Sequence, residues 1–142
     1  MSVADILKNW TVVAIDDEPD SLEVVSMILE LHGASVVTAS NGKEGIQLIT
    51  ELRPNLVITD LSMPGMSGWD LVKQINEGDR ALFDIPIIAL TAHASEQDRR
   101  RAIASGFTNF ISKPLNPENF ARQVIQLLAV EHPELQPYLE EV

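Results

Sequence analysis

The sequence predicts an α/β domain built on a parallel sheet with helices on both faces. Five short apolar runs rich in β-branched residues alternate strictly with five longer segments of helical periodicity. Strand and helix in strict alternation favour parallel strands joined by helical crossovers. At 142 residues the chain corresponds to one domain.

The five expected strands are short, as is typical of strands buried on both faces of a parallel sheet. They cover residues 11–15, 35–38, 56–59, 85–90 and 109–111. Pro86 falls in the fourth of these runs and belongs near the start of its strand, because proline cannot donate a ladder hydrogen bond.

The helices are predicted from their capping residues. Side-chain oxygens of Asn, Ser and Asp accept hydrogen bonds from the free N–H groups of a first turn. The first expected helix covers residues 19–31 and has proline at its first position. The next three begin at the capping pairs Asn41 and Glu44, Ser67 and Asp70, and Ser95 and Asp98; the first of these three ends at about residue 52 and the third near Gly106. The last helix begins at Asn116 and Pro117 and ends at about residue 130.

The alternation covers residues 10–130, which we take as the domain. Residues 1–9 form an N-terminal segment outside the pattern. Residues 131–142 form an acidic C-terminal tail with four Glu and no Lys or Arg. This tail is too short to be an output domain, so the sequence predicts a single-domain protein.

Composition excludes several functions. The chain has 10 Lys and Arg against 21 Asp and Glu, a formal net charge of −11, and no Cys. This balance argues against direct binding of nucleic acid or of an anionic membrane surface. Without Cys there is no disulfide or thiolate chemistry. The start resembles no signal peptide, and no apolar run approaches about 18 residues, so we expect a cytoplasmic protein.

Polar side chains follow four of the predicted strands at their carboxyl ends. Asp16 and Asp17 follow the first strand, Asp60 the third, Thr91 the fourth, and Lys113–Pro114 the fifth. Each alone has an ordinary explanation as a helix cap, a turn residue or a solvated lysine. Because ligand sites of open parallel sheets lie at this edge, their joint occurrence indicates a functional site.

Three converging carboxylates need a cation. Two carboxylates about 4 Å apart repel by about 4 kcal/mol at an effective dielectric constant of about 20. A hard divalent ion relieves this repulsion, and an all-oxygen donor set indicates Mg²⁺, with Mn²⁺ as an alternative. Since Mg²⁺ is usually held by one or two protein carboxylates, a third is left free to attack phosphorus.

These residues resemble the receiver domains of two-component response regulators. The resemblance rests on Asp16–Asp17, on Asp60 in TDLSMPGMSG, on Thr91–Ala92 after IPIIAL, and on Lys113–Pro114 after NFIS. It covers residues 10–130. It implies a flavodoxin-like doubly wound (βα)5 fold with strand order 2-1-3-4-5.

The resemblance also implies roles for the acidic residues. Asp60 would be the phosphoacceptor, receiving a phosphoryl group from a sensor histidine kinase or a histidine phosphotransfer protein. Asp17, Asp60 and the backbone carbonyl of Ser62 would ligate Mg²⁺. Asp16 would act mainly through a metal-bound water.

Other implied roles concern the phosphoryl group. Thr91 would bond it and Lys113 would pair with it, and the Lys113–Pro114 peptide would be cis. Thr91 would move toward the group while Phe110 turns inward; composition alone would make Phe110 an ordinary core residue, but its position on the last strand favours the switch role. Ser62 and His93 would govern water access and so the rate of dephosphorylation.

The function so implied is a phosphoacceptor that signals through phosphorylation-dependent protein–protein contacts. It would not be a turnover enzyme, although it would assist its own phosphotransfer and autodephosphorylation. The effector, the phosphoryl lifetime and phosphorylation-dependent dimerisation stay open. A haloacid dehalogenase-type hydrolase would need Asp where Ser62 stands. A flavodoxin would need a Ser/Thr-rich loop at residues 16–18, and a degenerate receiver would lack part of the acidic set.

Two surface features are expected beside the site. The first helix has an apolar arc of about 220°, wider than a sheet contact needs. Either Met27 and Leu31 are exposed for a kinase helix, or the N-terminal segment covers them. The basic run at residues 99–101 is interpreted as a solvated face, with Glu96–Arg100 and Asp98–Arg101 at stabilising spacings.

Overall fold

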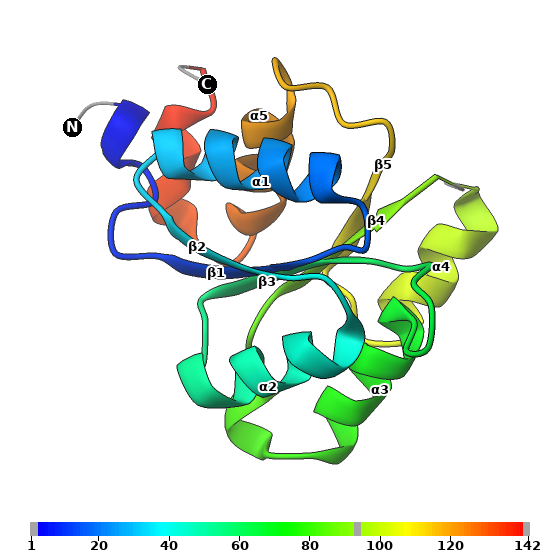
Figure 1. Ribbon diagram of the computed structural model, residues 1–142. Coiled ribbons are helices and arrows are strands. Elements are labelled where there is room, and N and C mark those ends of the chain that lie inside the picture. The colour runs from blue at the N-terminus through cyan, green and yellow to red at the C-terminus, as the bar shows by residue number, and fades with distance from the viewer. Residues whose placement is uncertain (1–2, 93–94, 141–142) are drawn as a thin grey trace.

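The computed structural model describes residues 3–92 and 95–140, which form a five-stranded parallel sheet with helices between the strands (Figure 1). The strands are β1 (Thr11–Ile15), β2 (Ser35–Ala39), β3 (Leu56–Asp60), β4 (Ile87–Thr91) and β5 (Asn109–Ser112). The helices are α1 (Pro19–Leu31), α2 (Gly42–Leu52), α3 (Gly68–Glu77), α4 (Glu96–Ala104) and α5 (Phe120–Leu128). Short 3₁₀ helices are η1 (Val3–Asp5), η2 (Arg80–Leu82) and η3 (Pro133–Tyr138).

The strand order is β2-β1-β3-β4-β5, which confirms the flavodoxin-like topology. Helices α1 and α5 cover one face of the sheet, and α2, α3 and α4 lie on the other (Figure 1). Each face has its own apolar cluster, because strand residues alternate between the two faces. Val12 and Ala14 of β1 belong to the first cluster, and Val13 and Ile15 to the second.

Three predicted helix caps are confirmed. The Asn41 side chain accepts a hydrogen bond from the backbone N–H of Glu44, and the Ser95 side chain accepts one from Asp98. Ser67 and Asp70 form a reciprocal capping box. These bonds satisfy N–H groups that a first helical turn leaves free, which fixes where α2, α3 and α4 begin.

Several predicted boundaries differ from the structure. The last helix begins at Phe120 rather than at Pro117. Asn116 still makes cap bonds, accepting from the backbone N–H of Glu118 with its side chain and from those of Asn119 and Phe120 with its carbonyl, so residues 117–119 form a turn that leads into α5. Strand β4 begins at Ile87, with Pro86 before it rather than within it. At their carboxyl ends β2 to β5 each extend one residue further than expected, so Asp60 and Thr91 are the last residues of their strands.

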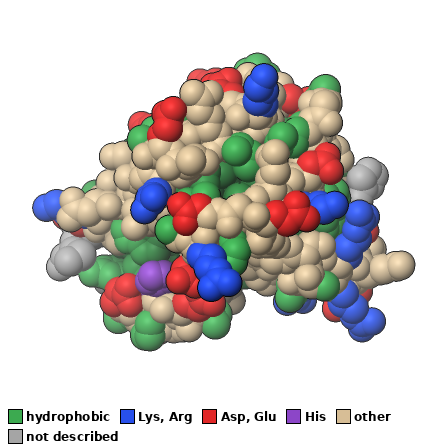
Figure 2. Space-filling view, turned by 90° about the horizontal axis from the view of Figure 1, so that it is seen from below, with side chains coloured by type: hydrophobic (Ala, Val, Ile, Leu, Met, Phe, Trp, Pro, Cys, Tyr) green, Lys and Arg blue, Asp and Glu red, His purple; other side chains and the backbone are tan. Residues whose placement is uncertain are grey.

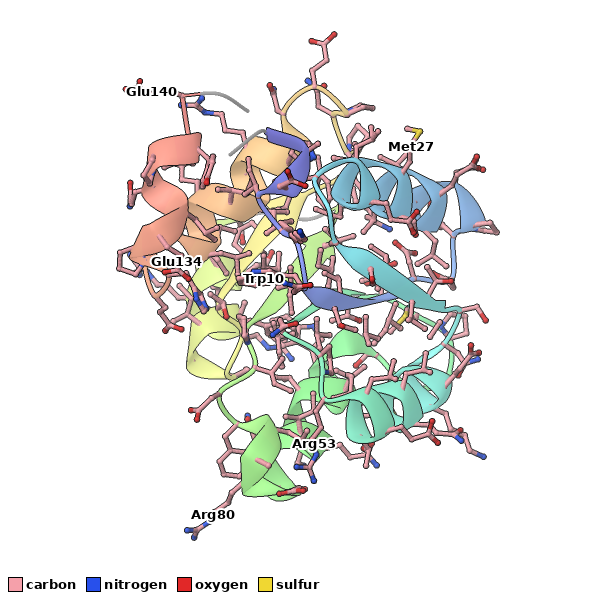
Figure 3. All side chains as sticks on the ribbon, turned by 90° about the vertical axis from the view of Figure 1, so that its left-hand side faces the viewer. Trp10, Met27, Arg53, Arg80, Glu134 and Glu140 are labelled. Atoms are coloured by element: carbon pink, nitrogen blue, oxygen red, sulfur yellow. The ribbon has the colours of Figure 1, made fainter. Side chains whose placement is uncertain are left out.

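Both segments outside the alternation pack against the domain. Ile6 and Leu7 are buried in the cluster under α1 and α5, and so is Leu135 of η3. The Trp10 ring meets the ring of His132 edge-on at 5.1 Å. Figure 3 shows the N-terminal segment and η3 on the same side of the molecule, with Trp10 and Glu134 labelled. None of the helices in the described part of the chain is long and apolar enough to cross a bilayer.

Candidate functional site

The carboxyl edge of the sheet brings the predicted site residues together. Asp16 directly follows β1, Asp60 ends β3, Thr91 ends β4, and Lys113 directly follows β5. Because β1, β3, β4 and β5 are successive neighbours in the sheet, these four positions lie along one edge. The convergence expected from the sequence is therefore what the fold produces.

The acidic side chains form a compact cluster. Asp16, Asp17, Glu18 and Asp60 each offer a carboxylate oxygen, and these oxygens all lie within 4.8 Å of one another. Asp16 is only 1% exposed and Asp60 only 5%, whereas Asp17 and Glu18 are exposed. The sequence alone did not predict that Glu18 belongs to this cluster, because Glu18 does not directly follow a strand end. The only signal in the sequence was its position next to two aspartates.

Lys113 is the cation of the cluster. Its Nζ lies 2.9 Å from Asp16 Oδ2, 3.0 Å from Glu18 Oε1 and 3.2 Å from Asp60 Oδ2. One ammonium therefore contacts three carboxylates that come from two different strand ends. Since four acids face a single base, the cluster retains a net negative charge and attracts further cations.

Backbone hydrogen bonds fix the two buried carboxylates. Asp16 Oδ1 accepts from the N–H of Glu18 at 2.9 Å, and Asp60 Oδ1 accepts from the N–H of Ser62 at 3.2 Å. Both remaining oxygens face Lys113. The start of α3 also packs tightly here: a Cβ on Gly68 would lie 2.5 Å from the backbone oxygen of Asp60, so glycine allows this close approach.

The pKa values of Asp16 and Lys113 are both raised, but for different reasons. Burial raises the pKa of Asp16, although its contacts with Lys113 and the N–H of Glu18 oppose this. Burial lowers the pKa of Lys113, but its close contacts with Asp16 and Glu18 and the charge of the nearby carboxylates outweigh this effect, so the pKa of Lys113 is raised. Lys113 is therefore firmly protonated at neutral pH.

The donor set fits a hard divalent cation. Asp16 Oδ2 is fully buried and makes no hydrogen bond, and its contact with Lys113 is an ion pair without hydrogen-bond geometry. The four acids supply only oxygen donors, the type that Mg²⁺ and Mn²⁺ prefer. An additional cation would relieve the repulsion that one ammonium leaves uncompensated.

Comparison with known proteins identifies the family. Residues 12–125 match the family model of the response regulator receiver domain, which is most of the chain. The chain belongs to this family. Receiver domains are not, in general, turnover enzymes. The resemblance predicted Asp16, Asp17 and Asp60 of the acidic cluster, and the structure adds Glu18 to them.

Individual relatives differ in how much of their length this receiver covers. The receiver is 37% identical over 120 residues to an uncharacterised 14.6 kDa protein of Leptolyngbya boryana, covering 84% of this chain and 91% of that protein. It is 33% identical to sensor protein GacS of Pseudomonas syringae pv. syringae, covering 86% of this chain but 14% of that protein. The receiver thus spans nearly all of one relative and a small part of the other.

A solved structure supports the fold. The receiver superposes on the chemotaxis response regulator CheY4 of Vibrio cholerae with a TM-score of 0.79 at 30% identity, covering 84% of this chain and 98% of that one. A structure from Chloroflexus aurantiacus described as a putative response regulator gives a TM-score of 0.76 at 27% identity.

The remaining residues that the resemblance singled out lie around the cluster. Thr91 is buried, and its backbone carbonyl accepts from the N–H of Lys113 at 2.7 Å. The Lys113–Pro114 peptide is cis. Phe110 is half-buried against the cluster under α2, α3 and α4, and Ser62 is exposed. His93 lies outside the described residues.

The expected surface features are present in part. Met27 and Leu31 are 52% and 65% exposed, so the N-terminal segment does not cover them, and Figure 3 shows Met27 pointing outward from α1. The arginines of α4 are exposed, and basic side chains gather at the right-hand edge of Figure 2, where α4 lies. Arg101 lies over the Trp69 ring at 4.1 Å, a contact that its spacing from Asp98 did not predict.

Proposed function

We propose that this receiver accepts a phosphoryl group on Asp60 from a phosphohistidine in a Mg²⁺-dependent reaction. The observation that carries the proposal is the position of Asp60: its Oδ2 lies 3.2 Å from the Lys113 ammonium, and its carboxylate lies within 4.8 Å of three other acids. A buried carboxylate held between a cation and an acidic metal-binding set is suited to nucleophilic attack on phosphorus.

The transfer is a single displacement at phosphorus. A carboxylate oxygen of Asp60 forms the new O–P bond while the N–P bond of the phosphohistidine breaks. The electron pair of that bond goes to the ring nitrogen. The histidine leaves as neutral imidazole if its other ring nitrogen carries a proton, and otherwise the departing ring takes up a proton from solvent. The site must mainly stabilise the negative charge on the equatorial phosphoryl oxygens.

The residues around Asp60 are suited to stabilise this negative charge. Lys113 carries the positive charge, and its raised pKa keeps it protonated. Thr91 ends the strand next to β3 and would donate its hydroxyl to a phosphoryl oxygen. Asp17, Asp60 and the Ser62 carbonyl would hold Mg²⁺, with Asp16 acting through a water. The ion would supply charge compensation for the phosphoryl oxygens.

The output is a change of surface contacts. An aspartyl phosphate adds about −1.5 to −2 charges and three acceptor oxygens at an edge that is already acidic. Thr91 would move toward these oxygens, and Phe110, half-buried on β5, would turn into the space behind it. The changed face, made by α4, β5 and α5, would then bind a partner protein. Ser62 and His93 would set the rate of hydrolysis.

The donor is proposed to be a histidine kinase or a phosphotransfer protein. One relative is named as a sensor protein, and another, from Dictyostelium discoideum, as a hybrid signal transduction histidine kinase. Exposed Met27 and Leu31 on α1, the helix that follows the acidic residues after β1, would give a kinase helix an apolar contact.

Intact-mass measurement after incubation with acetyl phosphate and Mg²⁺ tests the chemistry. The wild-type protein should gain one phosphoryl group, Asp60→Asn should gain none, and EDTA should suppress the gain. Glu51→Gln, which changes an exposed acid on α2, is the matched control and should react like wild type. Equal phosphorylation of Asp60→Asn would exclude Asp60 as the acceptor.

A further inference from the structure

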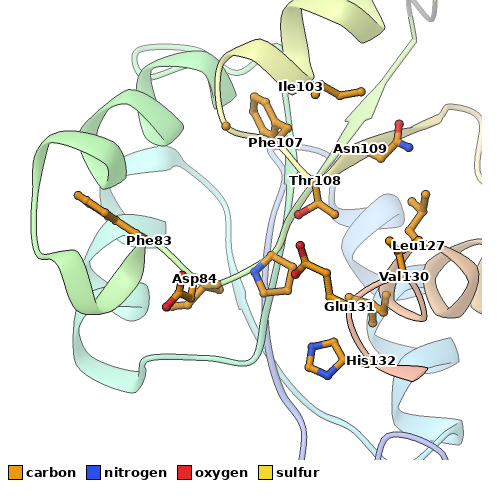
Figure 4. Close-up of a pocket in the computed structure, with 14 residues that line it drawn as sticks. Phe83, Asp84, Ile103, Phe107, Thr108, Asn109, Leu127, Val130, Glu131 and His132 are labelled. Atoms are coloured by element: carbon orange, nitrogen blue, oxygen red, sulfur yellow. The ribbon is translucent and has the colours of Figure 1, made fainter. Parts of the chain in front are cut away.

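A second hollow lies at the opposite end of β4 and β5 from the acidic cluster. It has a volume of about 820 Å³ and is lined by the η2–β4 connection, the end of α4, the start of β5 and the end of α5 (Figure 4). Ile87 and Thr91 mark the two ends of β4, which places the hollow about 13 Å from the carboxyl edge. We call this hollow the amino-edge groove.

The groove gathers exposed apolar side chains. Six large hydrophobic residues are exposed in the described part of the chain, and three of them line this groove: Phe83 at 47%, Ile103 at 50% and Val130 at 80%. They come from three segments far apart in the sequence. Single exposed apolar residues are ordinary, but three around one concavity indicate a contact surface.

The groove also carries negative charge that nothing in the described chain compensates. Asp84 and Glu131 both line it, and neither makes an ion pair within residues 3–92 and 95–140. Figure 4 shows the Glu131 side chain reaching from the end of α5 toward Thr108. His132, the remaining ionisable group of the lining, already contacts Trp10 and Glu134.

We infer that the amino-edge groove binds a basic amphipathic segment of a partner protein. Its apolar side chains would contact Phe83, Ile103 and Val130, and its Lys or Arg side chains would pair with Asp84 and Glu131. Charge complementarity decides the choice of occupant, because two unpaired carboxylates beside an apolar floor favour cationic side chains. The groove lies at the opposite end of β4 and β5 from the phosphorylation site and borders the α4–β5–α5 face proposed above as the output surface. Binding in the groove is inferred without reference to phosphorylation.

The same charges disfavour other occupants. Nucleic acids and anionic lipids would be repelled by Asp84, by Glu131 and by a net charge of −11. A second copy placed groove to groove would bring the same carboxylates face to face. The proposal therefore commits to a cationic, partly apolar peptide.

Fluorescence anisotropy with two labelled peptides tests this inference. The first is a short peptide with Leu on one helical face and Lys on the other, and the second has Glu in place of every Lys. With Mg²⁺ present throughout, the Leu/Lys peptide should bind and the Leu/Glu peptide should not. Asp84→Asn and Glu131→Gln should each weaken binding about two- to fivefold at low salt.

Val130→Ser should also weaken binding, and its high exposure makes it safe for folding. The matched control is Glu30→Gln on α1, an exposed acid away from the groove, which should leave binding unchanged. Amide chemical shifts should move at Thr108 and Val130 and not at Asp60. The inference would be overturned if both peptides bound equally, if the chemical-shift changes were confined to the acidic cluster, or if the groove variants bound the Leu/Lys peptide as tightly as wild type. Self-association through the groove in sedimentation would overturn it too, since the occupant would then be a second copy.

Discussion

The ammonium of Lys113 lies 2.9 Å from Oδ2 of Asp16, a carboxylate oxygen with no other polar partner in the described structure. The same ammonium lies 3.2 Å from Oδ2 of Asp60. One side chain at the end of β5 therefore holds the charges at the ends of β1 and β3 together. The stability of the fold and the reactivity of Asp60 are linked through this lysine.

Replacing Lys113 by alanine should destabilise the protein. The change leaves Asp16 and Asp60 buried and close together without a counter-charge. We expect a loss of about 2 kcal/mol in the free energy of unfolding, between the values for exposed and fully buried ion pairs. Urea denaturation in EDTA measures it, with Lys43→Ala on the exposed face of α2 as the control. Equal losses in the two variants would show that Lys113 has no special role in stability.

Replacing Asp16 by asparagine should have the opposite effect at neutral pH. The pKa of Asp16 is raised by burial, so the folded protein favours the protonated form. Asp16 therefore contributes stability below its unfolded pKa, near 3.8, and this contribution is lost as the pH rises through the raised folded pKa. At pH 7 without Mg²⁺, Asp16→Asn should be more stable than wild type by on the order of 1 kcal/mol.

The pH profile separates this electrostatic effect from packing. The advantage of Asp16→Asn should shrink as the pH falls toward 3.8, because the wild-type carboxyl is then also neutral. Lys113, whose pKa is raised, contributes stability below about 10.5 and does not change its charge in this range. If the stability advantage of Asp16→Asn stayed constant with pH, the raised pKa of Asp16 would not be its cause.

Magnesium should stabilise the protein through the same acids. At a concentration 100 times its dissociation constant, a ligand that binds only the folded state adds about 2.7 kcal/mol. Thermal unfolding with and without Mg²⁺ measures this increment. Asp17→Asn should reduce it, whereas Glu23→Gln, an exposed acid of α1, should not. An increment unaffected by Asp17→Asn would place the ion elsewhere.

The sequence predicted the sheet and its functional edge because these depend on local patterns. Buried β-branched runs identify strands, and Asn41, Ser67 and Ser95 identify helix starts through bonds that span three residues. The strand ends then place Asp16 and Asp60 at one edge without further information.

What the sequence did not predict depends on contacts between distant residues. Glu18 and Lys113 are 95 residues apart, and no local pattern indicates their bond. Arg101 lies over Trp69 of α3 instead of pairing with Asp98. Asn116 makes the cap bonds expected for a helix starting at Pro117, but its carbonyl also accepts from the N–H of Asn119, so residues 117–119 form a turn and the regular helix α5 begins at Phe120.

Two glycines near Asp60 should respond differently to alanine. A Cβ on Gly68 would lie 2.5 Å from the Asp60 carbonyl oxygen, so α3 or β3 must shift, at a cost of about 1–3 kcal/mol. Gly65 has φ +80 but no neighbour within 4 Å, so Gly65→Ala should cost about 1 kcal/mol in backbone strain alone. Only Gly68→Ala should slow phosphorylation by acetyl phosphate, and equal rates in both variants would refute the positional effect.

Leu135 tests whether residues beyond α5 belong to the folded core. Its side chain is 2% exposed in η3 and packs in the cluster under α1 and α5. Truncation of a buried leucine to alanine loses contacts and leaves a cavity, so Leu135→Ala should lower the free energy of unfolding by about 2–4 kcal/mol. Val130→Ala, at a position 80% exposed, should change it by less than about 0.5 kcal/mol.

Urea denaturation monitored by tryptophan fluorescence measures both variants, because Trp10 contacts His132 next to η3. A single transition shifted to lower urea for Leu135→Ala would show that η3 unfolds together with the sheet. If Leu135→Ala unfolded like Val130→Ala, η3 would be an appendage that adds no stability to the domain. The shift of the urea midpoint at an unchanged slope m distinguishes the two outcomes, because the midpoint does not carry the uncertainty of about 10–15% that extrapolated free energies have.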